Sequence, residues 1–167
     1  MNPQRTMFTS LFVASAAVAA QAQAPAAAPA AEPAAAAPAA AEQAITVPFD
    51  DANLTWRACP PFLPDGCGIA VVHGDPTRPN ADVFFRVPAG STVPRHWHSS
   101  AERMVLVSGA MTVTYEGQAP IALKTGSYAY GPAKLPHTAV CAPGAPCVLF
   151  IAFEGPVDLM SNESGAK

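Results

Sequence analysis

The stretch from Gly90 to Gly109 constrains the fold of this chain more than any other part of its sequence. Within it, His96 and His98 are two residues apart, and Glu102 follows four residues after His98. On a β-strand, residues two apart face the same side, so both imidazoles would point in one direction. A short turn after His98 would allow Glu102 to begin the next strand. The spacing therefore predicts that two imidazoles and one carboxylate converge on a single point.

A third imidazole, that of His137, follows a segment that contains Gly126 and Pro132. Three nitrogens and one oxygen form a borderline-hard ligand set that suits a divalent metal ion. A lone His-x-His pair is often a pair of ordinary surface or core histidines, and this alternative stays open. The nearby glutamate, the flanking glycines and the later histidine favour the metal site, whose candidate ligands are His96, His98, Glu102 and His137.

The spacing also resembles that of a known family. Gly90-x5-His96-x-His98-x3-Glu102-x6-Gly109 matches the first cupin motif at every position, and Gly126-x5-Pro132-x4-His137 has the spacing of the second. The chain is similar in particular to small exported bacterial cupins of one domain. The resemblance implies an all-β, single-domain cupin jelly-roll β-barrel. It also implies a metal inside the barrel, held by the same three histidines and the glutamate.

Two residues depart from the cupin pattern. Lys134 stands where the second motif usually has a glycine. A lysine forced into a left-handed conformation costs about 1 kcal/mol, so we expect this turn to differ slightly from that of the family. Cys141 stands where the motif usually ends in asparagine, a position that is not a metal ligand in the family. A disulfide at Cys141 could replace the structural role of that asparagine.

Short runs of β-forming residues, separated by turns rich in glycine and proline, continue through the rest of the domain. No segment shows a sustained helical period, so we expect a sandwich or barrel of strands about ten residues apart. Dipeptides such as Gly131-Pro132 are interpreted as turns. The predicted strands are Leu54–Arg57, Ile69–His73, Asp82–Val87, Thr92–His98, Arg103–Val107, Met111–Tyr115, Pro120–Leu123, Ser127–Tyr130, His137–Val140 and Val148–Phe153.

The chain divides into four predicted regions. Residues 1–22 resemble a secretory signal peptide, with a positively charged start, an apolar stretch and a small-residue cleavage site. Residues 23–44 are rich in alanine and proline, and the prolines interrupt any helix, so we expect a disordered, extended linker. The cupin domain is placed at 45–160, followed by a flexible tail at 161–167. A cleaved signal predicts a periplasmic or secreted protein.

The four cysteines are predicted to form disulfides, because export leads into an oxidising compartment. We favour Cys59–Cys67 and Cys141–Cys147 among the three connectivities, since each pair brackets a loop with proline and glycine. Each bond would stabilise the fold by roughly 2–3 kcal/mol. A zinc site made of cysteines is the alternative, but the spacings are not those of Cys-x-x-Cys.

The charge balance limits the partners. Lysine and arginine total 9 against 12 acidic residues, a formal net charge of -3, which argues against a nucleic-acid partner. No run of about 18 apolar residues is present, so we expect no membrane anchor beyond the signal. The expected partner is an unidentified small molecule, and a homodimer is compatible with the sequence.

Two function classes fit the predicted site. The first is a metalloenzyme, a dioxygenase or a lyase that acts on a small organic compound. The second is a non-catalytic ligand-binding or sensing cupin in which the metal is structural. The metal as isolated should be mostly zinc, with iron, copper, nickel or manganese also compatible. His73 is expected at a strand end outside the site. Aromatic residues and methionines in a barrel are usually core residues, but five side chains are candidates to line the barrel: Arg86, Met104, Tyr128, Tyr130 and Phe150.

Overall fold

The computed structural model describes residues 43–161, which consist of strands and turns without a helix. The predicted signal peptide, residues 23–42 of the predicted linker and residues 162–167 of the predicted tail lie outside the described residues. Ser161, expected in that tail, belongs to a short strand. Among residues 43–161, no helix is long and apolar enough to cross a membrane.

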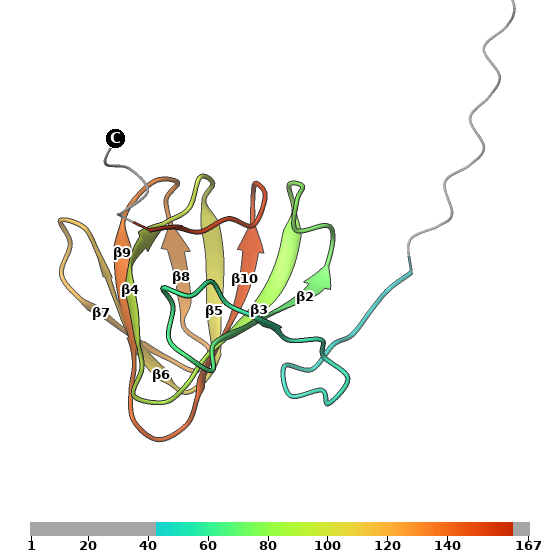
Figure 1. Cartoon of the computed structure of the whole chain (residues 1–167), viewed down its shortest axis with the longest axis horizontal. Helices are drawn as coiled ribbons and strands as arrows, with labels where there is room; N and C mark the ends of the chain where they lie inside the picture. The colour runs from blue at the N-terminus through green and yellow to red at the C-terminus, as the bar shows by residue number, and fades with distance from the viewer. Residues whose placement is uncertain (1–42, 162–167) are drawn as a thin grey trace, which may run out of the picture. The chain divides into compact units, whose positions relative to one another are not determined.

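The described strands form two antiparallel sheets that face each other (Figure 1). The first sheet has six strands in the order β1-β2-β3-β10-β5-β8, and the second has five in the order β11-β4-β9-β6-β7. The strands are β1 (Arg57–Ala58), β2 (Gly68–His73), β3 (Ala81–Val87), β4 (Thr92–Trp97), β5 (Glu102–Ser108), β6 (Ala110–Tyr115), β7 (Ile121–Lys124), β8 (Tyr128–Gly131), β9 (His137–Cys141), β10 (Cys147–Phe153) and β11 (Met160–Ser161).

The two sheets make a sandwich and not the closed barrel that the cupin resemblance implied. Among the described residues, no ladder of hydrogen bonds joins one sheet to the other. The physical reason lies at the edges, where β1 and β11 are each two residues long and β7 and β8 only four. Strands this short end each sheet before it can curl round to meet its neighbour.

The predicted all-β pattern is confirmed from β2 to β10, where each predicted strand shifts by one residue at most at either end. The first predicted strand, Leu54–Arg57, is wrong, because most of it is irregular and only Arg57 enters β1. The Trp56 side chain lies against Gly68, with the Arg86 guanidinium 4.2 Å from its ring centre. This aromatic packing replaces strand pairing there.

Period-two alternation places the core between the sheets. Along β10, residues 147, 149, 151 and 153 are all buried, and the same parity holds for 111, 113 and 115 of β6. The inward side chains form a mostly aliphatic core. Its large members include Leu63, Val83, Phe85, Val87, Val93, Met104, Leu106, Met111, Val113, Leu123, Leu149, Ile151 and Phe153.

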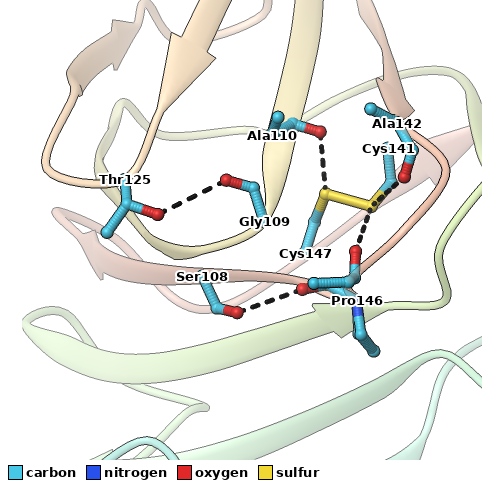
Figure 2. Close-up of a disulfide and its surroundings, with 9 residues drawn as sticks. Ser108, Gly109, Ala110, Thr125, Cys141, Ala142, Pro146 and Cys147 are labelled. Carbon is cyan, nitrogen blue, oxygen red and sulfur yellow. Dashed lines mark hydrogen bonds between the residues drawn. A yellow bond between two sulfur atoms is a disulfide. The ribbon is translucent and has the colours of Figure 1, made fainter.

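Two disulfides hold loops at the margins of the sandwich. Cys59 pairs with Cys67, and Cys141 pairs with Cys147, the connectivity favoured from the loop sequences. The second bond links β9 of one sheet to β10 of the other, because its two cysteines end and begin these strands (Figure 2). Nearby, the Ser108 hydroxyl donates a hydrogen bond to the Pro146 carbonyl, at 3.2 Å. The sheets are therefore covalently joined at this end.

The tight approach of Gly109 to this disulfide predicts a local sensitivity. Gly109 has φ +83°, and a Cβ there would lie 2.9 Å from the Pro146 carbonyl oxygen and 3.0 Å from Cys147 Cα. Gly117→Ala is the matched control, because Gly117 has φ +75° and a Cβ there would meet no atom within 4 Å. Both substitutions should lose about 1 kcal/mol to backbone strain, and Gly109→Ala should lose about 1–3 kcal/mol more through overpacking. Urea unfolding with the disulfides intact measures the difference, and equal losses would contradict the packing described here.

Candidate metal centre

The four predicted ligands come from three strands, two in one sheet and one in the other, and from the turn between two of these strands. His96 lies in β4, His98 follows just after that strand, Glu102 begins β5 and His137 begins β9. All four side chains are buried. The ring nitrogens of the three histidines lie within 4.8 Å of one another, one from each ring. The two-residue spacing of His96 and His98 thus turns both rings toward the interior, where His137 meets them.

The Glu102 carboxylate lies beside this cluster. Its Oε2 atom is 3.5 Å from His98 Nε2, and its Oε1 atom is 3.3 Å from His137 Nε2. Glu102 is 2% exposed, and its Oε1 atom has no hydrogen-bond partner. A buried anion without partners is costly, so this oxygen is suited to a cation held among the imidazoles.

Backbone carbonyls orient the three rings. The Nδ1 atom of His96 lies 2.8 Å from the Pro94 oxygen, that of His98 lies 2.5 Å from the Asp158 oxygen, and that of His137 lies 3.2 Å from the Leu135 oxygen. A carbonyl oxygen only accepts, so each Nδ1 carries the proton and donates it. Each Nε2 is then left as a lone pair, which is the arrangement found in histidines that bind metals.

Burial also sets the charge of these groups. It lowers the pKa of His96 to about 3, with the neighbouring His137 as a smaller cause. It lowers the pKa of His137 to about 4. It raises the pKa of Glu102, against a smaller opposing effect of His98. Neutral imidazoles are the form that ligates a metal, so the donor set fits a divalent ion.

The lysine that departs from the cupin pattern takes the backbone conformation of the glycine it replaces. Lys134 has φ +62°, so the turn keeps the left-handed conformation although the lysine was expected to change it slightly. Its backbone N–H donates a hydrogen bond to the His98 carbonyl at 2.8 Å. The strained turn therefore ties the segment before His137 to the segment that carries His98.

Gly131 has a structural role that was not predicted from its sequence context. It is not a turn residue but the last residue of β8, and it pairs with Glu102 across the sheet. A Cβ at Gly131 would lie 2.7 Å from Glu102 Oε1. In the sequence, only the position of Gly131 just before the proline of the second motif indicates this role. The absence of a side chain here makes room for the carboxylate.

A cavity of about 200 Å³ extends from the cluster into the core. Besides the three histidines and Glu102, its lining is almost entirely apolar. The segment 157–159, which follows β10, covers part of it and was not expected from the sequence. The other lining residues are Pro60, Ile69, Val83, Phe85, Met104, Met111, Val113, Ala139, Leu149, Ile151, Phe153, Val157, Asp158 and Leu159.

Of the five candidates to line the barrel, Met104 lines the cavity and the other four do not. Tyr128 and Tyr130 are 60% and 50% exposed, because Ala129 and Gly131 are the residues of β8 that face inward. Phe150 packs edge-on against Phe84, with ring centres 6.1 Å apart, outside the cavity. Arg86, likewise outside the cavity, stacks on Trp56. His73 ends β2, 3.9 Å from Asp82, and is not part of the histidine cluster.

Comparisons with known proteins agree on the fold. The family described as the ChrR cupin-like domain matches residues 43–158. No curated protein matches the sequence. The structure resembles the DMSP lyase DddQ from Ruegeria pomeroyi, with 18% identity over 68% of this chain and a TM-score of 0.58. The match spans 64% of that lyase.

Two further solved structures are similar. The polyketide cyclase RemF from Streptomyces resistomycificus is 16% identical over 71% of this chain and 86% of its own, with a TM-score of 0.57. The oxalate decarboxylase of Lactobacillus farciminis is 16% identical over 66% of this chain and 34% of its own, with a TM-score of 0.55. At such low identity these likenesses establish the fold alone.

The contact between Gly131 and Glu102 predicts how the site can be disturbed without touching a ligand. Gly131→Ala should displace the carboxylate and lower the affinity for zinc by about ten- to hundredfold, the usual effect of losing support around a ligand. Gly117→Ala adds the same methyl group in open space and should leave the affinity unchanged. Equilibrium dialysis against zinc measures both. An unchanged affinity in Gly131→Ala would show that Glu102 does not ligate.

Proposed function

The chain belongs to the ChrR cupin-like domain family, and on that premise we propose that it is an exported metalloenzyme of the cupin type. In this proposal a divalent metal is held by His96, His98, Glu102 and His137. The adjoining cavity receives a small organic compound, and the reaction is that of a dioxygenase or a lyase.

One observation carries the proposal. Three Nε2 atoms, on rings whose Nδ1 atoms lie against backbone carbonyls, and one unpartnered carboxylate oxygen meet at the polar end of an otherwise apolar cavity. A bound divalent metal supplies Lewis-acid chemistry there, and a redox-active one supplies dioxygen chemistry as well. The residues of the chain hold the ion and exclude water from the apolar part of the cavity.

The fold neighbours support an enzyme without choosing a reaction. They include proteins named as a lyase and a polyketide cyclase. The same sandwich therefore accommodates catalysts of different types, and the cavity of this chain must supply its own specificity.

A non-catalytic binding cupin is the second candidate, and one observation favours it. Among the described residues that line the cavity, Asp158 is the one ionisable side chain besides the proposed ligands. Its Oδ1 atom already accepts a hydrogen bond from the Ser99 N–H at 2.9 Å. The cavity therefore offers almost no side chain that could act as a general acid or base. Dioxygen consumption by the iron-loaded protein with small phenols or diketones would decide for the enzyme, and binding without turnover would decide for this alternative.

The ligand set predicts a clear split among histidine variants. His96→Ala and His98→Ala should each abolish stoichiometric zinc binding, because each removes a lone pair from the cluster. His73→Ala is the control and should bind zinc as the unsubstituted protein does, since His73 stands apart from the cluster. Zinc content after gel filtration measures the outcome. Zinc retained by a double His96→Ala/His98→Ala variant would refute the proposed site.

The metal itself follows from the proposed route of export. The two disulfides support an oxidising compartment such as the periplasm. Metal acquired there follows raw affinity, which rises toward copper and zinc and away from manganese and iron. Elemental analysis of protein taken from the periplasm should therefore show mostly zinc, with copper or nickel as minor occupants. Predominant manganese or iron would contradict this acquisition route and strengthen the case for an oxygenase.

A further inference from the structure

We propose that the cavity selects a compact monoanion, with one oxygen-bearing head at the histidine cluster and an uncharged apolar body. This inference rests on the proposed function, because the head is held by the metal. It adds a class of ligand to that function, and it excludes ligands that carry a second charged group.

The strand register gives the cavity a polar end and an apolar end. Glu102 pairs with Phe153 across β5 and β10, and His96 pairs with His137 across β4 and β9, so the ligands share one level of the sandwich. Two inward positions further along β10 lies Leu149, which lines the opposite end. Four residues of strand span about 13 Å. A ligand with its head at the cluster must therefore extend its body among aliphatic side chains.

Charge is confined to the polar end. No lysine or arginine is found among the described residues that line the cavity. At its apolar end the walls are formed by Phe85, Met111 and Leu149, which offer no hydrogen-bond donor in their side chains. An anionic head can be neutralised by a metal at the histidines, whereas a second carboxylate at the far end would be buried without a partner. Such burial is strongly unfavourable.

The size of the cavity limits the class of ligand further. The cavity measures about 200 Å³. An engineered apolar cavity of about 150 Å³ accommodates benzene, and sites for drug-sized ligands begin near 300 Å³. The space therefore suits a single-ring acid or a medium-chain acid. It is too small for a disaccharide or a nucleotide.

A matched pair of acids tests the inference on the zinc-loaded full chain. Hexanoate and adipate have the same carbon chain and differ in the second carboxylate. Isothermal titration should show hexanoate binding at least a hundredfold more tightly than adipate. Equal affinities, or no binding of either acid to protein that holds zinc, would overturn the inference and leave the metal site standing. Failure of the unsubstituted protein to bind zinc would instead overturn the proposed function.

Two variants separate a filled cavity from a damaged fold. Ala139 lines the cavity two residues after His137, so Ala139→Leu should occupy the space of the ligand body. This variant should keep its zinc and lose at least tenfold in hexanoate affinity. Met104→Leu conserves volume and should keep both. Unchanged hexanoate affinity in zinc-loaded Ala139→Leu would place the acid outside the cavity and overturn the inference. Val113→Phe, on β6, the strand that pairs with β9 in the same sheet, repeats the test if Ala139→Leu does not fold.

Discussion

A carboxylate buried without a hydrogen-bond partner is the constraint on which the centre of this molecule depends. Glu102 Oε1 lies 3.3 Å from His137 Nε2, yet the proton of that ring sits on Nδ1, where the Leu135 carbonyl accepts it. The imidazole therefore presents a lone pair to an oxygen that also carries lone pairs. Burial raises the pKa of Glu102 and lowers that of His137, so neither group favours its charged form. A divalent cation satisfies both donors at once.

The rest of the sandwich holds this arrangement rigid. The cluster lies at one end of the inward-facing positions, and aliphatic side chains fill the levels beyond it. At the opposite end, the Cys141–Cys147 bond joins the two sheets (Figure 2). Gly131 contributes by having no side chain where the carboxylate must fit. Rigid strands and a covalent link between the sheets keep the donor atoms close together in an interior that would otherwise exclude polar groups.

Much of this could be predicted from the sequence, because strand parity and motif spacing are local properties. The two-residue step from His96 to His98 predicts a shared face, and the structure places both rings there. Parity on β8 could not be assigned in the same way, since its alternating residues include two tyrosines that resemble core residues but are exposed. The closure of the sheets depends on how far edge strands extend, which no local pattern encodes. The predicted barrel was therefore wrong while the strands were right.

The contacts that orient the rings could not be predicted from the sequence either, but for a different reason. All three Nδ1 atoms donate to backbone carbonyls, which every residue type possesses. For His98 the acceptor is Asp158, which lies 60 residues later and precedes β11, the strand that pairs with β4. The Ser99 N–H donates to the side chain of the same aspartate. His98 is thus oriented only when the segment after β10 has returned to lie beside β4. The three histidines and Glu102 come together only in the folded sandwich, so a metal bound by them would stabilise the fold.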